Sequence, residues 1–218
     1  MKNEKLKILY DDNDLLVIDK PAGINADDIP GRVHRLDKDT SGVLLVAKND
    51  KTLEFLQKQF SAATESYGGQ AGKIVKKYVA LIVGHLKNND GAIETLIGRS
   101  PKDKRKQKVY LPNDPRAGGK RIAITKYAVL KRFVDYDLIE VEPKTGRKHQ
   151  IRCHFAHLGH PIAGDKMYGF KNQICPQGLK RQFLHASYLK IKLPDEEEKE
   201  FTSELPNDLK EVIESLKS

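Results

Sequence analysis

The chain has 218 residues, enough for one domain that buries roughly 70% of the surface its unfolded chain exposes. Lys and Arg outnumber Asp and Glu by 39 to 30, and the formal net charge of +9 favours polyanionic partners such as nucleic acid. No apolar run approaches the ~20 residues of a membrane span, and the opening residues lack the apolar core of a secretion signal. These features exclude an integral membrane protein and predict a single soluble domain over residues 1–218, located in the cytoplasm.

Short apolar runs separated by turn residues predict the following elements in chain order. They are two short strands within 7–19, a buried strand at 43–47, a helix from 49 or 50, a flexible connection at 64–72, strands at 76–84, 122–130, 136–141 and 187–193, and a helix over 206–216. Asn49 or Asp50 can cap the first helix, because Leu53, Leu56 and Phe60 then share one face. The last helix is amphipathic and is expected to pack on the sheet.

The segment from Arg99 to Lys126 is strongly basic and is interrupted by Pro and Gly. A run of charge is often only a solvated or disordered loop. Here Tyr110 lies inside the run and strands flank it, so the pattern favours a mobile loop that lies along phosphates.

The most informative stretch is HRLDKDTSG, residues 34–42, followed at once by an apolar run. It places Asp37 on a loop that leads into a buried strand, and loops on a rigid scaffold often carry catalytic groups. By itself the same stretch is ordinary turn chemistry, in which Asp and Ser side chains bond backbone amides. Asp39 and Thr40 are assigned to that turn.

A second motif, TGRKHQIR at residues 145–152, leads into a segment rich in histidine that also contains Cys153. Imidazole and thiolate groups at this spacing can share a zinc ion, so a metal site is one interpretation of the residues alone. The two cysteines, Cys153 and Cys175, are predicted to be free thiols.

Together these motifs resemble the RluA-type pseudouridine synthases. The resemblance runs from Tyr10 to about Leu216 and adds DKPAG at 19–23, Lys77-Tyr78 ahead of an apolar strand, and GHPIAGD at 159–165. It implies an α+β fold, with a bent, mixed, mainly antiparallel sheet and flanking helices. It also implies an isomerase that flips specific uridines of rRNA or tRNA out of the stack and converts them to pseudouridine. These enzymes use no metal and no nucleotide cofactor, so none is expected, and the chain is expected to act on structured RNA as a monomer.

The resemblance also assigns roles to individual residues. Asp37 is the catalytic aspartate, and Arg152 pairs with its carboxylate and favours the ionised form. Tyr78 stacks on the target base and is a candidate for proton transfer. Arg35 fills the space that the flipped base leaves, or contacts a phosphate. The other expected RNA-binding residues are His34, Arg147, Ile151, Lys104, Arg105 and Lys106.

The chain departs from the family pattern in three places. Only ten residues, 24–33, separate DKPAG from HRLD, which predicts a trimmed RNA-facing edge, and Lys148 stands where Thr or Ser is usual. Few residues precede the first strand, so no N-terminal S4-like RNA-binding domain is expected. The alternative function is a non-catalytic RNA-binding or ribosome-assembly protein on the same scaffold, which would not need Asp37, Tyr78 and Arg152 together.

Overall fold

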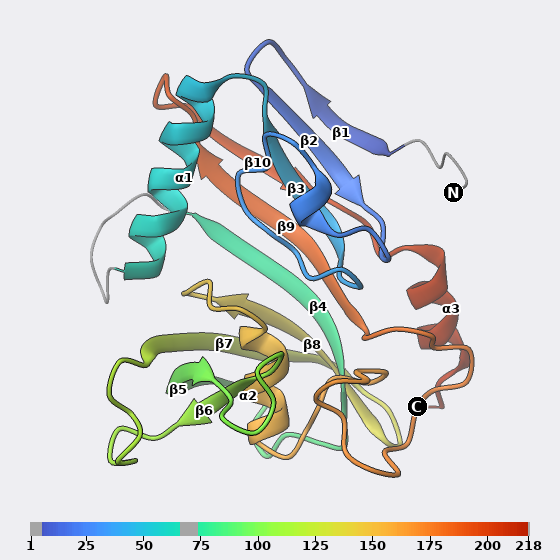
Figure 1. Ribbon diagram of the computed structural model, residues 1–218. Coiled ribbons are helices and arrows are strands. Elements are labelled where there is room, and N and C mark those ends of the chain that lie inside the picture. The colour runs from blue at the N-terminus through green and yellow to red at the C-terminus, as the bar shows by residue number, and fades with distance from the viewer. Residues whose placement is uncertain (1–5, 66–73, 218) are drawn as a thin grey trace. The chain divides into compact units, whose positions relative to one another are not determined.

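The computed structural model describes residues 6–65 and 74–217 (Figure 1). The chain divides into two compact units, one formed by Met1–Lys76 and His185–Pro206 and the other by Lys77–Leu184 and Asn207–Ser218. Most of the predicted connection at 64–72 lies outside the described residues. One catalytic domain over residues 1–218 stays a prediction.

The first unit is built on five strands in the order β1-β2-β3-β9-β10. Their bounds are β1 Lys7–Asp11, β2 Leu15–Lys20, β3 Ser41–Ala47, β9 Leu184–Lys192 and β10 Glu198–Thr202. All neighbours are antiparallel except β3 and β9. A short 3-10 helix, Ala26–Asp28, precedes β3, and helix α1, Asp50–Glu65, follows it.

The core of this unit joins the sheet to α1. Leu15, Val17, Val43 and Leu45 from the strands cluster with Leu56 of the helix. The helix begins where the sequence predicts, because the side-chain oxygen of Asn49 accepts a hydrogen bond from the Thr52 amide at 2.9 Å. Every residue of β3 is buried, as expected for a continuous apolar run.

Gly42 allows β3 to lie against β9. It pairs with Ala186 in the parallel ladder, and its backbone φ is +117°. A Cβ at this position would lie 2.2 Å from the carbonyl oxygen of Ala186. The neighbouring Ser41 hydroxyl lies 3.0 Å from Nδ1 of the buried His185, whose Nε2 donates to the Ser203 carbonyl at 3.0 Å. Close backbone approach therefore fixes the entry of β3.

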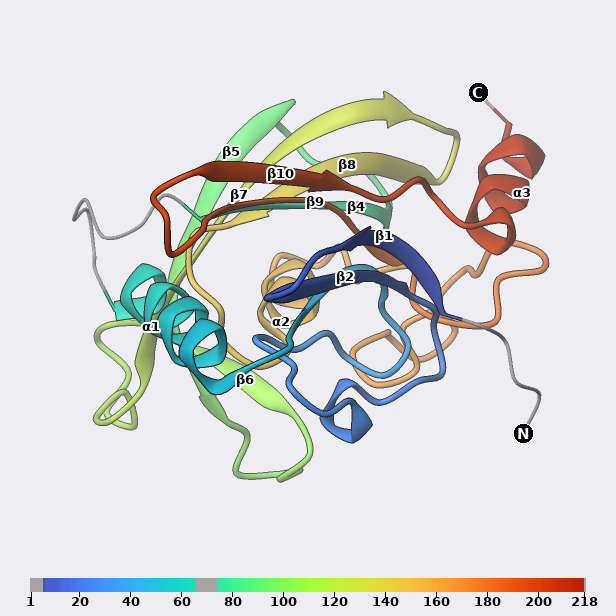
Figure 2. The ribbon, with the colours of Figure 1, turned by 90° about the horizontal axis from the view of Figure 1, so that it is seen from above.

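The second unit contains five antiparallel strands in the order β4-β8-β7-β5-β6. Their bounds are β4 Val75–Val83, β5 Asp90–Arg99, β6 Gln107–Tyr110, β7 Arg121–Arg132 and β8 Tyr136–Pro143. Helix α2, Gln150–His157, packs against β6, β7 and β8 (Figure 2). The strands of both units are mainly antiparallel, which confirms the predicted α+β class.

The prediction of one continuous loop between Arg99 and the strand at 122–130 was wrong, because β6 lies inside that segment. Val109 and Tyr110 are buried there, and Tyr110 pairs with Leu96 of β5. Two buried positions among many charges give almost no alternating pattern, so the strand has little sequence signal.

The predicted C-terminal helix is α3, Asn207–Ser215, with Leu209 and Val212 buried. The guanidinium of Arg181 donates to Asp208 of this helix at 2.7 and 3.1 Å. In the part of the chain that the structure describes, no helix is both long and apolar enough to cross a membrane.

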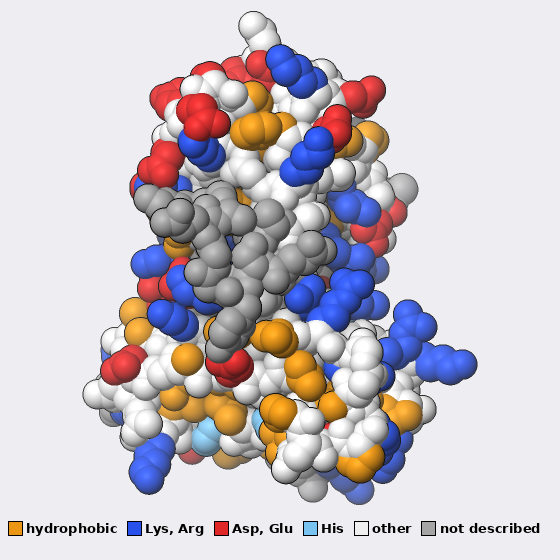
Figure 3. All heavy atoms as spheres, turned by 90° about the vertical axis from the view of Figure 1, so that its left-hand side faces the viewer, with side chains coloured by type: hydrophobic (Ala, Val, Ile, Leu, Met, Phe, Trp, Pro, Cys, Tyr) orange, Lys and Arg blue, Asp and Glu red, His pale blue; other side chains and the backbone are white. Residues whose placement is uncertain are grey.

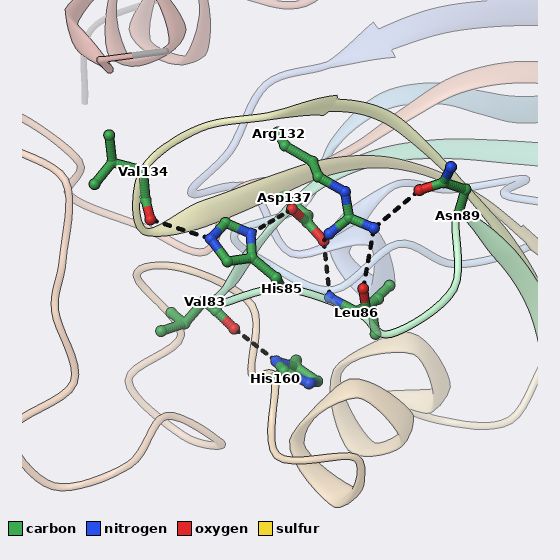
Figure 4. Close-up of polar contacts among 8 residues, drawn as sticks. All are labelled: Val83, His85, Leu86, Asn89, Arg132, Val134, Asp137 and His160. Carbon is green, nitrogen blue, oxygen red and sulfur yellow. Dashed lines mark hydrogen bonds and ion pairs between the residues drawn. The ribbon is translucent and has the colours of Figure 1, made fainter.

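A buried acid holds the connection between β4 and β5 (Figure 4). The carboxylate of Asp137 accepts hydrogen bonds from the Leu86 amide, the Arg132 guanidinium and Nδ1 of His85, each at 2.8 Å. The second ring nitrogen of His85 donates to the Val134 carbonyl at 3.1 Å. Both nitrogens therefore act as donors, and the hydrogen bond to Asp137 raises the pKa of His85.

The opposite environment surrounds His154, which attaches α2 to the sheet. Its side chain is fully buried, Nδ1 lies 2.8 Å from the hydroxyl of Thr125, and Nε2 lies 3.0 Å from the hydroxyl of Thr95. Burial lowers the pKa of His154 to about 4. The ring is thus neutral in the folded protein at physiological pH.

Gly42→Ala tests the close approach of β3 and β9. We expect the free energy of unfolding to fall by about 2–6 kcal/mol, because overpacking and a positive φ each cost about 1–3 kcal/mol. Urea unfolding measures this. Gly118→Ala is the control, since its Cβ would meet nothing within 4 Å and its φ is not positive. Equal urea midpoints for both variants would contradict the argument.

The two histidines predict opposite pH dependences. The folded-state pKa of His154 lies below its ordinary 6.5. The contribution of His154 to the free energy of unfolding is therefore complete above pH 6.5 and is lost as the pH falls toward about 4. The slope is at most about 1.4 kcal/mol per pH unit. Urea titrations should show that the free energy of unfolding of His154→Gln falls less steeply in acid than that of wild type.

The folded-state pKa of His85 is raised, so its contribution to the free energy of unfolding is complete below pH 6.5 and is lost as the pH rises. His85→Gln should therefore change the pH dependence only above 6.5, and a change confined to acid pH would contradict this.

Candidate active site

Asp37 opens a tight turn in the first unit, immediately before β3. The Thr40 amide donates to the Asp37 carbonyl at 3.0 Å, which confirms that Asp39 and Thr40 belong to the turn. Thr40 and Ser41 are buried, whereas Asp37 is half-buried. The carboxylate is thus carried by a turn whose far end is anchored in the core.

A buried lysine holds the other side of this turn. The side chain of Lys20 is fully buried, and its Nζ donates to three carbonyl oxygens, those of Pro21 at 2.8 Å, Ile24 at 2.9 Å and Lys38 at 3.2 Å. The Gly23 amide donates to the same Lys38 carbonyl at 2.9 Å. The DKPAG and HRLD motifs are therefore joined through Lys20. Sequence reasoning missed this role, although a lysine at an inward position of an apolar strand is a usable signal.

His34 is half-buried in the first unit and packs against α1. Its ring stacks on Phe60 of α1, with centroids 4.7 Å apart and planes 8° apart, and its Nε2 accepts a hydrogen bond from the Leu45 amide at 3.2 Å. Burial, together with the charges of Lys76 and Arg32, lowers the pKa of His34 to about 3. The neutral ring supports the loop that carries Asp37, and the RNA-binding role of His34 stays a prediction.

Arg35 is exposed at the surface of the first unit. Its Nη2 lies 3.5 Å from one oxygen of Asp27, and the other oxygen of Asp27 lies 2.7 Å from Nη2 of Arg32. The short connection at 24–33 thus contains an aspartate, Asp27, that lies within ion-pair distance of two arginines. An exposed guanidinium with such a long contact can exchange this partner for a phosphate at low cost.

Arg152 projects from α2 in the second unit and is almost fully buried. Its Nε and Nη2 donate to the two carboxylate oxygens of Asp165 at 2.7 and 2.9 Å. Asp165 also accepts hydrogen bonds from the amides of Met167 and Tyr168. Burial would raise the pKa of Asp165, but Arg152 and these amides outweigh it and hold that pKa below its ordinary value.

Asp165 was absent from the predicted site residues. It is the last residue of GHPIAGD, so the resemblance contained the signal without the role. The predicted partner of Arg152, Asp37, belongs to the other unit, and that pairing stays a prediction.

Gln150 organises the motif at 145–152. Its buried amide nitrogen donates to the Ile124 carbonyl and to the Thr125 hydroxyl, both at 2.9 Å. Its side-chain oxygen accepts from the Thr145 hydroxyl at 2.7 Å and from the Arg147 amide at 3.0 Å. Two of these contacts connect the start of α2 to the loop before it, and the other two connect it to β7.

The other expected residues of the second unit lie in different settings. Ile151 is buried in the core cluster, against which the half-buried ring of Tyr78 packs. Tyr78 lies on β4 opposite Val141 of β8. Nε of Arg147 donates to the Ile122 carbonyl at 2.9 Å. The structure therefore brings Tyr78 and Ile151 to one core, and it places Arg147 at the edge of β7.

Lys104, Arg105 and Lys106 lie in the loop that joins β5 to β6. Arg105 is strongly exposed, and its guanidinium donates to Asp103 at 3.0 and 2.9 Å. These bonds raise the pKa of Arg105 and lower that of Asp103 to about 2. Lys and Arg side chains stand out along the right-hand edge of the lower part of Figure 3. The ion pair reduces the net charge that Arg105 brings to this loop.

Cys153 and His154, two of the side chains on which the zinc interpretation rests, lie in surroundings that do not suit a metal ligand. Cys153 is buried, and burial raises its pKa to about 12, so it stays a thiol. Both cysteines are free, as predicted. Both ring nitrogens of His154 contact threonine hydroxyls. In residues 6–65 and 74–217, no group of three or more His, Cys, Asp or Glu side chains is arranged to hold a metal ion.

Comparison with solved structures places this geometry among known proteins. The chain is similar to human RNA pseudouridylate synthase domain containing 1, with 27% identity, a TM-score of 0.81, and coverage of 96% of this chain and 88% of the other. For human RNA pseudouridylate synthase domain containing 4 the identity is 26% and the TM-score 0.75, with 95% and 92% covered.

Curated relatives agree with the structural neighbours. An uncharacterized RNA pseudouridine synthase of Bacillus subtilis is 38% identical, over 97% of this chain and 73% of the relative. One of Chloroflexus aurantiacus is 42% identical, over 86% and 54%, and the ribosomal large subunit pseudouridine synthase D of Borreliella burgdorferi is 35% identical, over 94% and 66%. The chain thus spans between about half and three quarters of the length of these bacterial relatives.

A family model described as RNA pseudouridylate synthase matches residues 24–157. That range contains Asp37, Tyr78 and Arg152, the three residues for which the motifs predict catalytic roles. Because the model covers more than half of the chain and the Bacillus relative shares 38% of its residues, this chain belongs to the RNA pseudouridylate synthase family, a family of isomerases.

Proposed function

We propose that residues 1–218 act as one catalytic domain that converts specific uridines of structured RNA to pseudouridine. The observation that carries the proposal is the turn that presents Asp37, with Lys20 on one side and the buried Thr40 and Ser41 on the other. A carboxylate on a fixed turn is oriented before the substrate arrives, which is how catalytic groups gain most of their effect.

The reaction rearranges one nucleotide and needs no group donor. The bond between N1 of uracil and C1′ of ribose breaks, the base turns, and C5 bonds to C1′. The C5 proton passes to solvent and N1 takes up a proton, so that the product is an isomer of uridine. We assign to Asp37 the attack or proton abstraction that starts this sequence. Tyr78 stacks on the flipped base, and Arg152 keeps the carboxylate ionised. The base must leave the RNA stack, which costs a few kcal/mol, and Arg35 is the side chain that we assign to the vacated space.

The substrate class rests on the relatives. The relative from Borreliella burgdorferi and two further bacterial relatives carry the name ribosomal large subunit pseudouridine synthase D, which favours rRNA as the substrate of this chain over tRNA. The basic loop at 100–106, with Lys104, Arg105 and Lys106, is the phosphate-binding surface of the proposal, and His34, Arg147 and Ile151 complete the proposed RNA-binding set. A protein that only binds RNA would need the loop but not the ordered turn around Asp37.

Asp37→Asn should abolish tritium release from RNA that carries C5-labelled uridine and leave RNA affinity within about a few fold, because phosphate contacts dominate affinity. Asp39→Asn is the matched control, since it removes the same charge from the same turn at a position outside the proposed machinery. Its activity should stay within about a few fold of wild type. Wild-type tritium release by Asp37→Asn would refute the assignment of Asp37.

Replacing Lys104, Arg105 and Lys106 together by Ala should weaken binding to the substrate and to bulk RNA about equally. The slope of log affinity against log salt should become shallower, by about 0.7 for each phosphate of single-stranded RNA that the variant no longer neutralises. Filter binding at several salt concentrations measures both effects.

A matched control removes the same formal charge elsewhere. Lys190, Lys192 and Lys199 each pair with a glutamate, Glu198, Glu196 and Glu197 respectively. Replacing these three lysines by Ala should leave the salt slope nearly unchanged. If both triple variants flatten the slope equally, only net charge matters and the loop has no special role. If the loop variant loses affinity for one RNA sequence alone, the loop reads bases.

A further inference from the structure

The half-buried Tyr168 contacts three parts of the second unit. Its hydroxyl oxygen accepts a hydrogen bond from the backbone amide of Gln107 at 2.7 Å and lies 3.0 Å from Nδ1 of His149. Its ring lies 5.1 Å from the guanidinium carbon of Arg152. One side chain therefore touches the start of β6, the start of α2 and the predicted catalytic arginine.

The direction of one of these bonds follows from its donor. Because the Gln107 amide can only donate, the tyrosine oxygen accepts there, whereas the donor between this hydroxyl and Nδ1 of His149 depends on the tautomer of the ring. Burial raises the pKa of Tyr168, so the hydroxyl keeps its proton. The His149 ring lies edge-on to Tyr168, with centroids 5.6 Å apart. His149 also has a left-handed backbone with φ of 56°, a conformation that costs energy in a non-glycine residue and needs support from its surroundings.

The same residue helps to hold Arg152. The backbone amide of Tyr168 donates to Asp165 at 3.0 Å, and Asp165 binds two nitrogens of Arg152. The guanidinium is thus fixed by a carboxylate in its plane and by an aromatic ring nearby. A bidentate pair of this kind sets direction as well as charge.

Tyr168 also contacts the end of the basic loop at 100–106. Gln107 is the first residue of β6 and directly follows Lys106, whose Nζ lies 6.0 Å from the Tyr168 ring. Tyr168 also packs against the small core cluster that contains Val109 of β6 and Cys153 of α2. The end of the loop is therefore attached to α2 through Tyr168.

We propose that Tyr168 is a positioning residue that joins the basic loop at 100–106 to Arg152, so that RNA held by the loop and the catalytic arginine keep one fixed geometry. The proposal rests on the proposed function for its kinetic consequences. The physical link itself is independent of turnover.

Tyr168→Phe keeps the ring and removes only the hydroxyl. With pseudouridine formation as the assay, we expect kcat to fall about ten-fold or more with KM changed less than about three-fold, because small displacements of catalytic groups are costly. The matched control is Tyr110→Phe on β6, the strand that begins with Gln107. The Tyr110 hydroxyl donates to the Arg99 carbonyl at 3.0 Å and has no contact with α2 among the described hydrogen bonds. It should lose comparable stability toward urea and keep kcat within about two-fold.

A second measurement reads the link without turnover. The Nε–H signal of Arg152 is followed by NMR while a single-stranded oligouridylate is added to the full chain. We expect this signal to shift in wild type and in Tyr110→Phe. In Tyr168→Phe it should stay in place while the amide signals of residues 100–106 still shift.

The outcomes separate the two proposals. If wild type forms no pseudouridine in any cellular RNA but the Arg152 signal shifts as described, the proposed function fails and the link stands. If Tyr168→Phe matches Tyr110→Phe in kcat, or if its Arg152 signal shifts as in wild type, the link is overturned while the proposed function stands.

Discussion

The geometry of the candidate active site depends most on the hydrogen bonds that the buried ammonium group of Lys20 donates. A charged group that is fully buried is costly to hold unless partners replace its lost water. Here three backbone carbonyls, from two motifs that are separate in the sequence, supply that replacement. Because the lysine needs these oxygens, the backbone on both sides is fixed, and the turn that carries Asp37 has one geometry.

The second unit uses the same principle with the opposite sign. Asp165 is buried and negative, and its partners are the guanidinium of Arg152 and two backbone amides. Removing one partner of such a pair would leave a buried charge uncompensated, which typically costs about 3–5 kcal/mol. In each unit, a buried ion therefore orders the segment that carries a predicted catalytic side chain. Order of this kind lets a site stabilise a transition state without first reorganising itself.

Much of the fold could be predicted from local patterns. The apolar run before Ala47 predicts a buried strand, and the spacing of Leu53, Leu56 and Phe60 predicts α1; both are confirmed. Strand β6 could not be predicted, since its Val109 and Tyr110 are buried only through pairing with β5 and packing of α2. Strand β5 shows alternating burial, so the sequence carries a signal for this strand, although the predicted elements do not include it.

The sequence by itself determined the family, most of the elements, and the candidate residues Asp37, Tyr78 and Arg152, because motifs and periodicity are local properties of the chain. Only the tertiary structure decided which groups hold them. Asp165 lies 13 positions from Arg152, and Tyr168 lies 61 from Gln107. Hydrogen bonds over such separations leave no periodic trace. They exist because buried charges and amides must find partners, and folding determines which partners are within reach.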